Sequence, residues 1–184
     1  VRPPHVESPR PTLDGTAYLA ARDPWHAAAL DWLNTEASGT PVIAEAWGDS
    51  YGEFTRVSMN TGLPTILGWD YHVHQRAHDW PPIDARKADV ARLYQSGDAK
   101  EVGDILDRYR VRYVYVGELE QRTYGAGAAA RLAGFERLLQ PVYRNPGVLI
   151  LATRAAGAPR PLLARDPLPV ASPTPPPRGL REPR

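Results

Sequence analysis

The chain has 184 residues, which is enough for one domain with a hydrophobic core. Its 22 Lys and Arg residues nearly balance 21 Asp and Glu residues, so we expect no nucleic-acid partner. The absence of cysteine excludes a disulfide scaffold and Cys-ligated metal sites. No apolar run reaches the roughly 18 residues of a membrane span. Because the chain begins with Val1 rather than Met, we expect it to come from a longer parent protein.

Proline divides the chain into three parts. Residues 1–12 hold four prolines and are predicted to form an extended linker. Residues 155–184, which include nine prolines and no aromatic residue, are predicted to form an extended or disordered tail. The globular domain is therefore expected over residues 13–154.

Within this domain, helical and strand patterns alternate. Asp23 and Pro24 are typical of a helix start, and Asp98 with Glu101 has the spacing of a capping box. Asn145-Pro146-Gly147 is predicted to be the turn of a β-hairpin. The expected elements are a helix from residue 24 to about 38, a strand at 41–46, a helix at 51–60, a strand at 64–68, helices at 87–96 and 99–109, a strand at 112–117, a helix at 119–134 and a hairpin at 138–154.

This order predicts an α/β fold with a mainly parallel, mixed sheet flanked by helices. The C-terminal hairpin is expected at the sheet edge, where it adds antiparallel pairing. In such sheets, ligands bind beyond the carboxyl ends of the strands. The loops at 45–51 and 68–80 occupy that position in the sequence.

A histidine-rich stretch after the second expected strand is the first candidate site. His72, His74 and His78 follow the pattern H-x-H-x-x-x-H, and Asp70 or Asp79 could complete a metal site. A metal-dependent hydrolase is therefore one alternative. The spacing matches no zincin motif, and surface or hydrogen-bonding histidines beside Trp69 and Tyr71 are the favoured explanation. We accordingly predict no metal and no cofactor.

The segment "EAWGDSYGE" is the second candidate. Helix capping explains Asp49, Ser50 and Glu53. It does not explain Glu45, a carboxylate in an apolar strand, which needs a partner if it is buried. The candidates for that partner are Arg56 and Arg86.

Several long motifs occur in an order that resembles a known family. They are "LDGTAYL", "GTPVIAEAWGDSYGEFTRVSMNTGLPTILGWDYHVHQR", "ILDRYRVRYVYVGELEQRTY" and "VYRNPGVLIL". Together they resemble the soluble C-terminal portion of the Chlor_Arch_YYY (DUF2298) family of polytopic membrane proteins, over residues 12–152. Within them, "WGDSYG" is similar in kind to the W-W-D-Y-G segment with which oligosaccharyltransferases hold their acceptor peptide, although Ser50 is inserted.

The resemblance implies a domain on the extracytoplasmic face of a multi-pass membrane protein similar to GT-C glycosyltransferases. The domain is expected to be non-catalytic alone and to act in acceptor or lipid-linked sugar recognition. Its implied partners are the membrane half of the parent and a glycan or polyprenyl-phosphate sugar. A free-standing carbohydrate- or peptide-binding module is the other alternative. The expected binding surface comprises Glu45, Tyr51, Arg56, Asn60, Trp69, His72 and Arg86.

Overall fold

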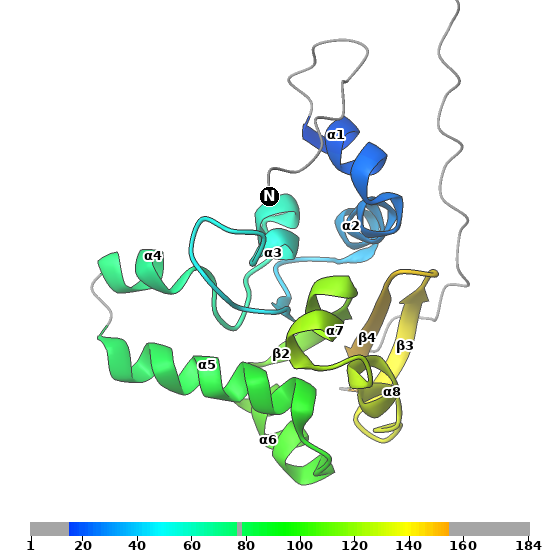
Figure 1. Cartoon of the computed structure of the whole chain (residues 1–184). Coiled ribbons are helices and arrows are strands. Elements are labelled where there is room, and N and C mark those ends of the chain that lie inside the picture. Colours follow the sequence, from blue (N-terminus) through cyan, green and yellow to red (C-terminus); the bar gives the residue numbers. More distant parts are fainter. Residues whose placement is uncertain (1–14, 77–78, 155–184) are drawn as a thin grey trace, which may run out of the picture.

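The computed structural model describes residues 15–76 and 79–154, so the predicted linker at 1–12 and tail at 155–184 lie outside it. Helices lie on both sides of a four-stranded sheet (Figure 1). The helices are α1 (Gly15–Arg22), α2 (Pro24–Glu36), α3 (Arg56–Thr61), α4 (Asp70–Gln75), α5 (Trp80–Gln95), α6 (Ala99–Arg108), α7 (Glu118–Tyr124) and α8 (Ala128–Ala133). The strands are β1 (Val42–Ala44), β2 (Val111–Val116), β3 (Leu139–Arg144) and β4 (Leu149–Thr153). None of the helices in the described ranges is long and apolar enough to cross a membrane.

The sheet has the strand order β1-β2-β4-β3. β1 and β2 pair in parallel, whereas β4 pairs antiparallel with both β2 and β3. The α/β class, the mixed sheet and the hairpin at its edge are confirmed. The parallel share is smaller than predicted, because the segment 64–68 contributes one isolated bridge, between Ile43 and Thr65, instead of a strand.

Pro64 explains why this segment does not extend the sheet further. Its carbonyl accepts the backbone N–H of Ile43 at 2.8 Å, and Ile66 N–H returns to the Ile43 carbonyl at 3.3 Å. Because proline has no N–H, the hydrogen-bond ladder cannot continue in the direction of Pro64. Ile66 and Leu67 are nevertheless buried, so the segment still fills the core.

Alternation along the strands supplies a core to each face of the sheet. In β2, Val114 and Val116 point to the face covered by α5, α6, α7 and α8. Tyr113 and Tyr115 point to the opposite face, which packs against α2 and α3. The buried Tyr94 hydroxyl of α5 shares its one proton between the Ala44 carbonyl, at 2.9 Å, and the Tyr115 carbonyl, at 2.7 Å, which ties α5 to the parallel strand pair.

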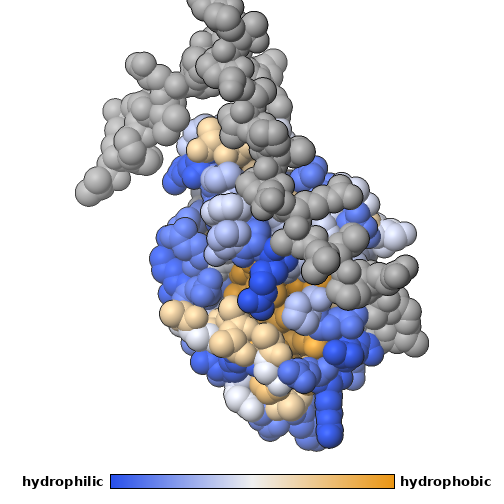
Figure 2. Space-filling view, turned by 90° about the vertical axis from the view of Figure 1, so that its right-hand side faces the viewer, coloured by the Kyte–Doolittle hydropathy of each residue, from blue (hydrophilic) through white to orange (hydrophobic). Residues whose placement is uncertain are grey.

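The exposed edge of the sheet is β3. Figure 2 views the molecule from the side on which Figure 1 draws β3 and α8, and it shows a band of hydrophobic residues among hydrophilic ones. Pro141 lies in the middle of β3, where it removes one backbone donor, and the pairing with β4 shifts register between Pro141 and Tyr143. Both features discourage the addition of a further strand at this edge.

Three local predictions need correction. The helix expected at 51–60 begins only at Arg56, because Tyr51 and Thr55 adopt left-handed backbone conformations with φ of 64° and 66°. The helix expected at 119–134 is divided into α7 and α8 at Gly125, which has φ of +100°. The loop expected at 68–80 contains the short helix α4.

Candidate functional site

The carboxyl ends of the parallel strands β1 and β2 bring two acidic residues into the interior. Glu45 directly follows β1, and Glu120 lies in the first turn of α7, just after β2. Their exposed fractions are 1% and 0%. Buried carboxylates require hydrogen bonds, so the partners of each show what it does.

Glu45 caps helix α3. Its carboxylate accepts the backbone N–H of Val57 at 2.8 Å and that of Ser58 at 3.0 Å. The predicted capping by Asp49 or Ser50 is therefore wrong, and the partners of Glu45 are backbone groups rather than an arginine side chain. Burial raises the pKa of Glu45 to about 7; the two backbone hydrogen bonds oppose this shift and the nearby Glu120 charge adds to it.

Glu120 fixes the start of the loop that follows β1. Its carboxylate accepts the backbone N–H of Ala46 at 3.0 Å and that of Gly117 at 2.8 Å. One oxygen lies 3.9 Å from Arg56 Nη2. Sequence reasoning missed Glu120; its position three residues after a glycine at a helix start was the signal that could have revealed it.

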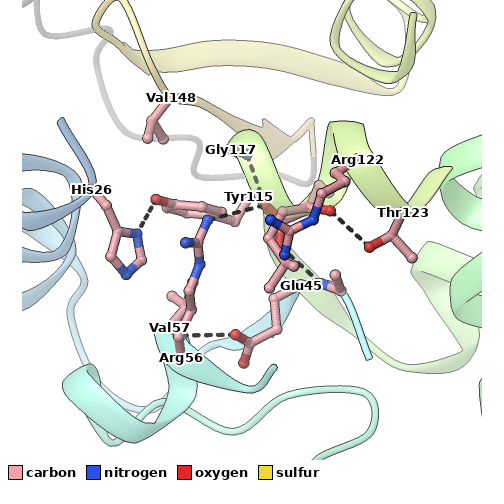
Figure 3. Close-up of polar contacts among 12 residues, drawn as sticks. His26, Glu45, Arg56, Val57, Tyr115, Gly117, Arg122, Thr123 and Val148 are labelled. Carbon is pink, nitrogen blue, oxygen red and sulfur yellow. Dashed lines mark hydrogen bonds and ion pairs between the residues drawn. The ribbon is translucent and has the colours of Figure 1, made fainter. Parts of the chain in front are cut away.

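A third polar contact lies between α2 and β2. His26 Nδ1 and the Tyr115 hydroxyl are 2.5 Å apart, and Figure 3 shows Arg56 beside them. Burial and, to a smaller extent, the positive charge of Arg56 lower the pKa of His26 to about 4, although Asp23 opposes the shift. His26 is therefore neutral at physiological pH, and Arg56 carries the positive charge of this group.

An aromatic cluster forms from Tyr51, Trp69 and His72, three of the residues that the sequence proposed. The ring centres of Tyr51 and Trp69 are 5.2 Å apart, those of Tyr51 and His72 are 4.9 Å apart, and those of Trp69 and His72 are 5.2 Å apart. His72 Nε2 and the Tyr51 hydroxyl form a hydrogen bond of 2.8 Å. We call this group the Tyr51 cluster.

The Tyr51 cluster has one exposed ring and two half-buried ones, and it is held in place by hydrogen bonds. Tyr51 is 70% exposed, although a large aromatic ring gains free energy by burial. The Trp69 indole N–H donates to the Phe54 carbonyl at 3.1 Å, which fixes its ring against the loop. Tyr51 itself holds a left-handed backbone conformation, with φ of 64°. Such strained positions gather at functional sites.

Lys87 of α5 links the loop to α4 beside this cluster. Its ammonium lies 5.1 Å from the ring centre of Trp47 and 5.2 Å from that of Trp80, which are cation–π distances. The same ammonium is 2.9 Å from Asp70 Oδ2, and the Ser50 hydroxyl donates to Asp70 Oδ1 at 2.9 Å. Helix α4 is thus held through Asp70 by two neighbouring segments, namely α5 through Lys87 and the loop after β1 through Ser50.

The histidines of α4 have different ring partners. His72 belongs to the Tyr51 cluster, whereas His74 stacks on Trp80 at 4.4 Å. His78 lies outside the described residues. No group of three His, Cys, Asp or Glu residues suited to a metal ion occurs within residues 15–76 and 79–154.

The remaining candidates have other partners. Asn60 Nδ2 donates to the Arg56 carbonyl at 2.6 Å. Arg86 Nη1 donates to the Ile66 carbonyl at 2.7 Å, and its guanidinium is 5.3 Å from the ring centre of Tyr109. The structure therefore gathers Tyr51, Trp69 and His72 on the surface and places Glu45 and Arg56 in the buried polar group. A binding role for these seven residues stays a prediction.

Comparison with known proteins gives one structural similarity. No family model matches the chain, and no curated protein matches it. Among solved structures, it is similar to the C-terminal globular domain of an oligosaccharyltransferase from Archaeoglobus fulgidus, with 11% sequence identity and a TM-score of 0.42. The match covers 68% of this chain and 94% of that domain. The resemblance to the DUF2298 family stays a prediction.

Proposed function

We propose that this chain is a carbohydrate-recognition domain that belongs to a glycosyltransferase-like membrane protein and is non-catalytic by itself. Its sugar-binding surface is the Tyr51 cluster. The observation that carries the proposal is a surface group of three aromatic rings at the position where ligands bind in α/β folds, in which Tyr51 is 70% exposed and Trp69 and His72 are half-buried.

The cluster has the chemistry that a pyranose requires. The C–H face of a sugar ring is apolar and packs on an aromatic face, whereas its hydroxyls need hydrogen-bond partners. Trp69 offers the larger ring, and the Tyr51 hydroxyl lies at its border, where it is bonded to His72 Nε2 and can form a further hydrogen bond. Because Trp69 and His72 are already held by hydrogen bonds, little side-chain entropy is lost on binding.

The buried carboxylates support a non-catalytic role. Glycoside chemistry uses a pair of carboxyl groups that flank the scissile bond and reach the sugar. Glu45 and Glu120 are buried and each binds two backbone N–H groups, so both oxygen pairs face the protein interior. Their role in this proposal is to shape the loop that carries Tyr51.

The location of the domain is part of the same proposal. The ordered sequence motifs support a parent with upstream membrane helices and an extracytoplasmic position for residues 15–154. Sequencing the complete gene tests this part directly. An open reading frame with no membrane-spanning segments would reject the membrane parent and leave a free-standing carbohydrate-binding module.

Calorimetric titration with a panel of oligosaccharides tests the site itself. The panel includes maltotriose, cellotriose and triacetylchitotriose, and we expect saturable binding of at least one. Tyr51→Ala should weaken that binding at least tenfold. Tyr18→Ala is the matched control, because Tyr18 is also an exposed tyrosine, at 52%, and lies on α1. Equal losses in both variants, or no loss in Tyr51→Ala, would reject the cluster as the binding site.

A further inference from the structure

A pocket of ≈ 320 Å³ opens beside the carboxyl end of β2, and the proposed sugar site does not use it. Arg22 of α1, Arg56 of α3 and Arg122 of α7 line it, together with Trp25. Three guanidinium groups from three different helices therefore converge on one cavity. Its volume is at the lower end of the range for small-ligand sites.

Within residues 15–76 and 79–154, few of the guanidinium donors of these arginines have a protein acceptor. Each guanidinium carries five N–H donors. Arg22 Nη1 donates to the Tyr18 hydroxyl at 3.0 Å, and Arg122 pairs with Glu53. No hydrogen bond from the Arg56 side chain occurs within the described part of the chain, where its buried Nε and Nη2 atoms have no acceptor.

Two carboxylates form ion pairs with Arg56 but no hydrogen bonds. Asp23 Oδ2 is 3.9 Å from Nη1, and Glu120 Oε2 is 3.9 Å from Nη2. Both distances exceed the length of an N–H···O hydrogen bond. The carboxylates also have other donors, since Asp23 accepts the backbone N–H of His26 and Glu120 accepts that of Gly117.

Gly117 permits this arrangement of Arg56. A Cβ atom at residue 117 would lie 3.1 Å from Arg56 Nη2 and 2.9 Å from a ring carbon of Tyr115. The guanidinium thus packs directly against the backbone at the end of β2. A side chain at this position would crowd the Tyr115 ring and Arg56 Nη2.

From the hydrogen-bond partners of these arginines, we propose that the pocket binds an oxyanion, either a carboxylate or a phosphate group of a small ligand. The oxyanion accepts hydrogen bonds from Arg56 Nη1, since Nε and Nη2 are buried, and from the donors of Arg22 and Arg122 that their protein partners leave unused. Arginine suits both groups, because its planar fork matches two oxygens at once. Asp23, Glu53 and Glu118 also line the pocket, which favours a singly charged oxyanion whose remaining groups donate hydrogen bonds.

Nuclear magnetic resonance of the ¹⁵N-labelled chain tests this proposal, with the arginine Nε–H signals as the readout. Inorganic phosphate and acetate are titrated separately at constant ionic strength, and sodium chloride serves as the reference anion. We expect saturable shifts of the Arg56 and Arg122 signals with one or both probes, and the stronger probe identifies phosphate or carboxylate as the ligand group. Shifts that do not saturate, or that chloride reproduces, would overturn the proposal.

Three variants make the outcome specific. Arg122→Gln changes an exposed side chain and should weaken probe binding at least fivefold while the fold is retained. Arg108→Gln is the matched control, because Arg108 also pairs with an acidic residue but lies on α6, away from this pocket. Tyr51→Ala should leave phosphate and acetate binding unchanged. Loss of binding in the Arg108 variant, or none in the Arg122 variant, would contradict the assignment.

Discussion

Glu45 and Val57 are joined by a 2.8 Å hydrogen bond from the Val57 backbone N–H to the Glu45 carboxylate. The bond connects the end of β1 to the start of α3 and closes the base of the intervening loop. Glu120 holds Ala46 at the other end of the same loop. Tyr51, the most exposed ring of the proposed sugar site, therefore sits on a loop that two buried carboxylates hold at both ends.

Loss of the Glu45 side chain should destabilise the domain. Glu45→Ala removes the cap of α3 and leaves two backbone N–H groups without acceptors, so we expect the free energy of unfolding to fall by about 2 kcal/mol at pH 8. Urea denaturation followed by tryptophan fluorescence measures the change. Glu53→Ala is the control, because Glu53 forms an exposed pair with Arg122 and should change stability by less than about 0.5 kcal/mol.

Glu45 and His26 should give opposite pH dependences of stability. The Glu45 pKa is about 7 in the folded protein against an ordinary 4.5, so protonation of Glu45 makes the free energy of unfolding rise as the pH falls from about 7 to 4.5. The His26 pKa is about 4 against an ordinary 6.5, so the free energy of unfolding falls as the pH falls from about 6.5 to 4. Each effect is on the order of 3 kcal/mol.

Single variants should separate the contributions of Glu45 and His26 to the pH dependence of stability. In the unmodified chain, these contributions nearly cancel between about pH 4.5 and 6.5. Glu45→Gln should leave a protein that loses stability on acidification through the His26 window. His26→Asn should leave one that gains stability as the pH falls from 7 to 4.5. Urea denaturation at half-unit pH steps gives both profiles. Identical slopes in the two variants would show that neither residue titrates as described.

Asp89 should contribute far more to the free energy of unfolding than Asp104, which is also an ion-paired aspartate. It is buried, and its carboxylate accepts the Tyr109 hydroxyl at 2.6 Å and Arg108 Nη1 at 2.8 Å. We expect Asp89→Asn to lower the free energy of unfolding by about 2 kcal/mol. The control is Asp104→Asn, which affects an exposed pair with Lys100 and should cost less than about 0.5 kcal/mol. Thermal unfolding distinguishes them, and equal effects would contradict the structural reading.

The purified chain should not turn over sugar substrates. Incubation with the oligosaccharide panel, followed by mass spectrometry, should show neither hydrolysis nor transfer products. The physical reason is that the buried carboxylates Glu45 and Glu120 are bound to backbone N–H groups and do not reach a surface ligand. Turnover that Glu45→Gln abolishes would contradict the proposed non-catalytic role.

Local signals in the sequence predicted much of the fold. Asp23 caps α2 as expected, with its side chain accepting the His26 backbone N–H, and Asp98 caps α6. The turn at Asn145-Pro146-Gly147 joins β3 and β4. These features depend on neighbouring residues, so their chemistry is visible in a short stretch of sequence.

Features that depend on distant contacts were missed. The left-handed conformation of Tyr51 and the helix α4 accompany contacts with residues some twenty positions away, such as the hydrogen bond between Tyr51 and His72. Glu120 binds Ala46 across 74 positions, a pairing that no local pattern encodes. The seven candidate residues therefore do not form one surface in the structure. A residue's position in the sequence near a strand end does not fix the direction of its side chain.

The most direct test of the central claim is the response of the Trp69 indole N–H signal when the ¹⁵N-labelled chain is titrated with the oligosaccharide panel. We expect a saturable shift of Trp69 with at least one oligosaccharide, no comparable shift of Trp32, and loss of the response in Tyr51→Ala. Trp32 is a suitable reference because it packs against Tyr113 and Tyr143 on another part of the domain. A Trp69 signal that no oligosaccharide moves would contradict the assignment of the Tyr51 cluster as a sugar-binding site.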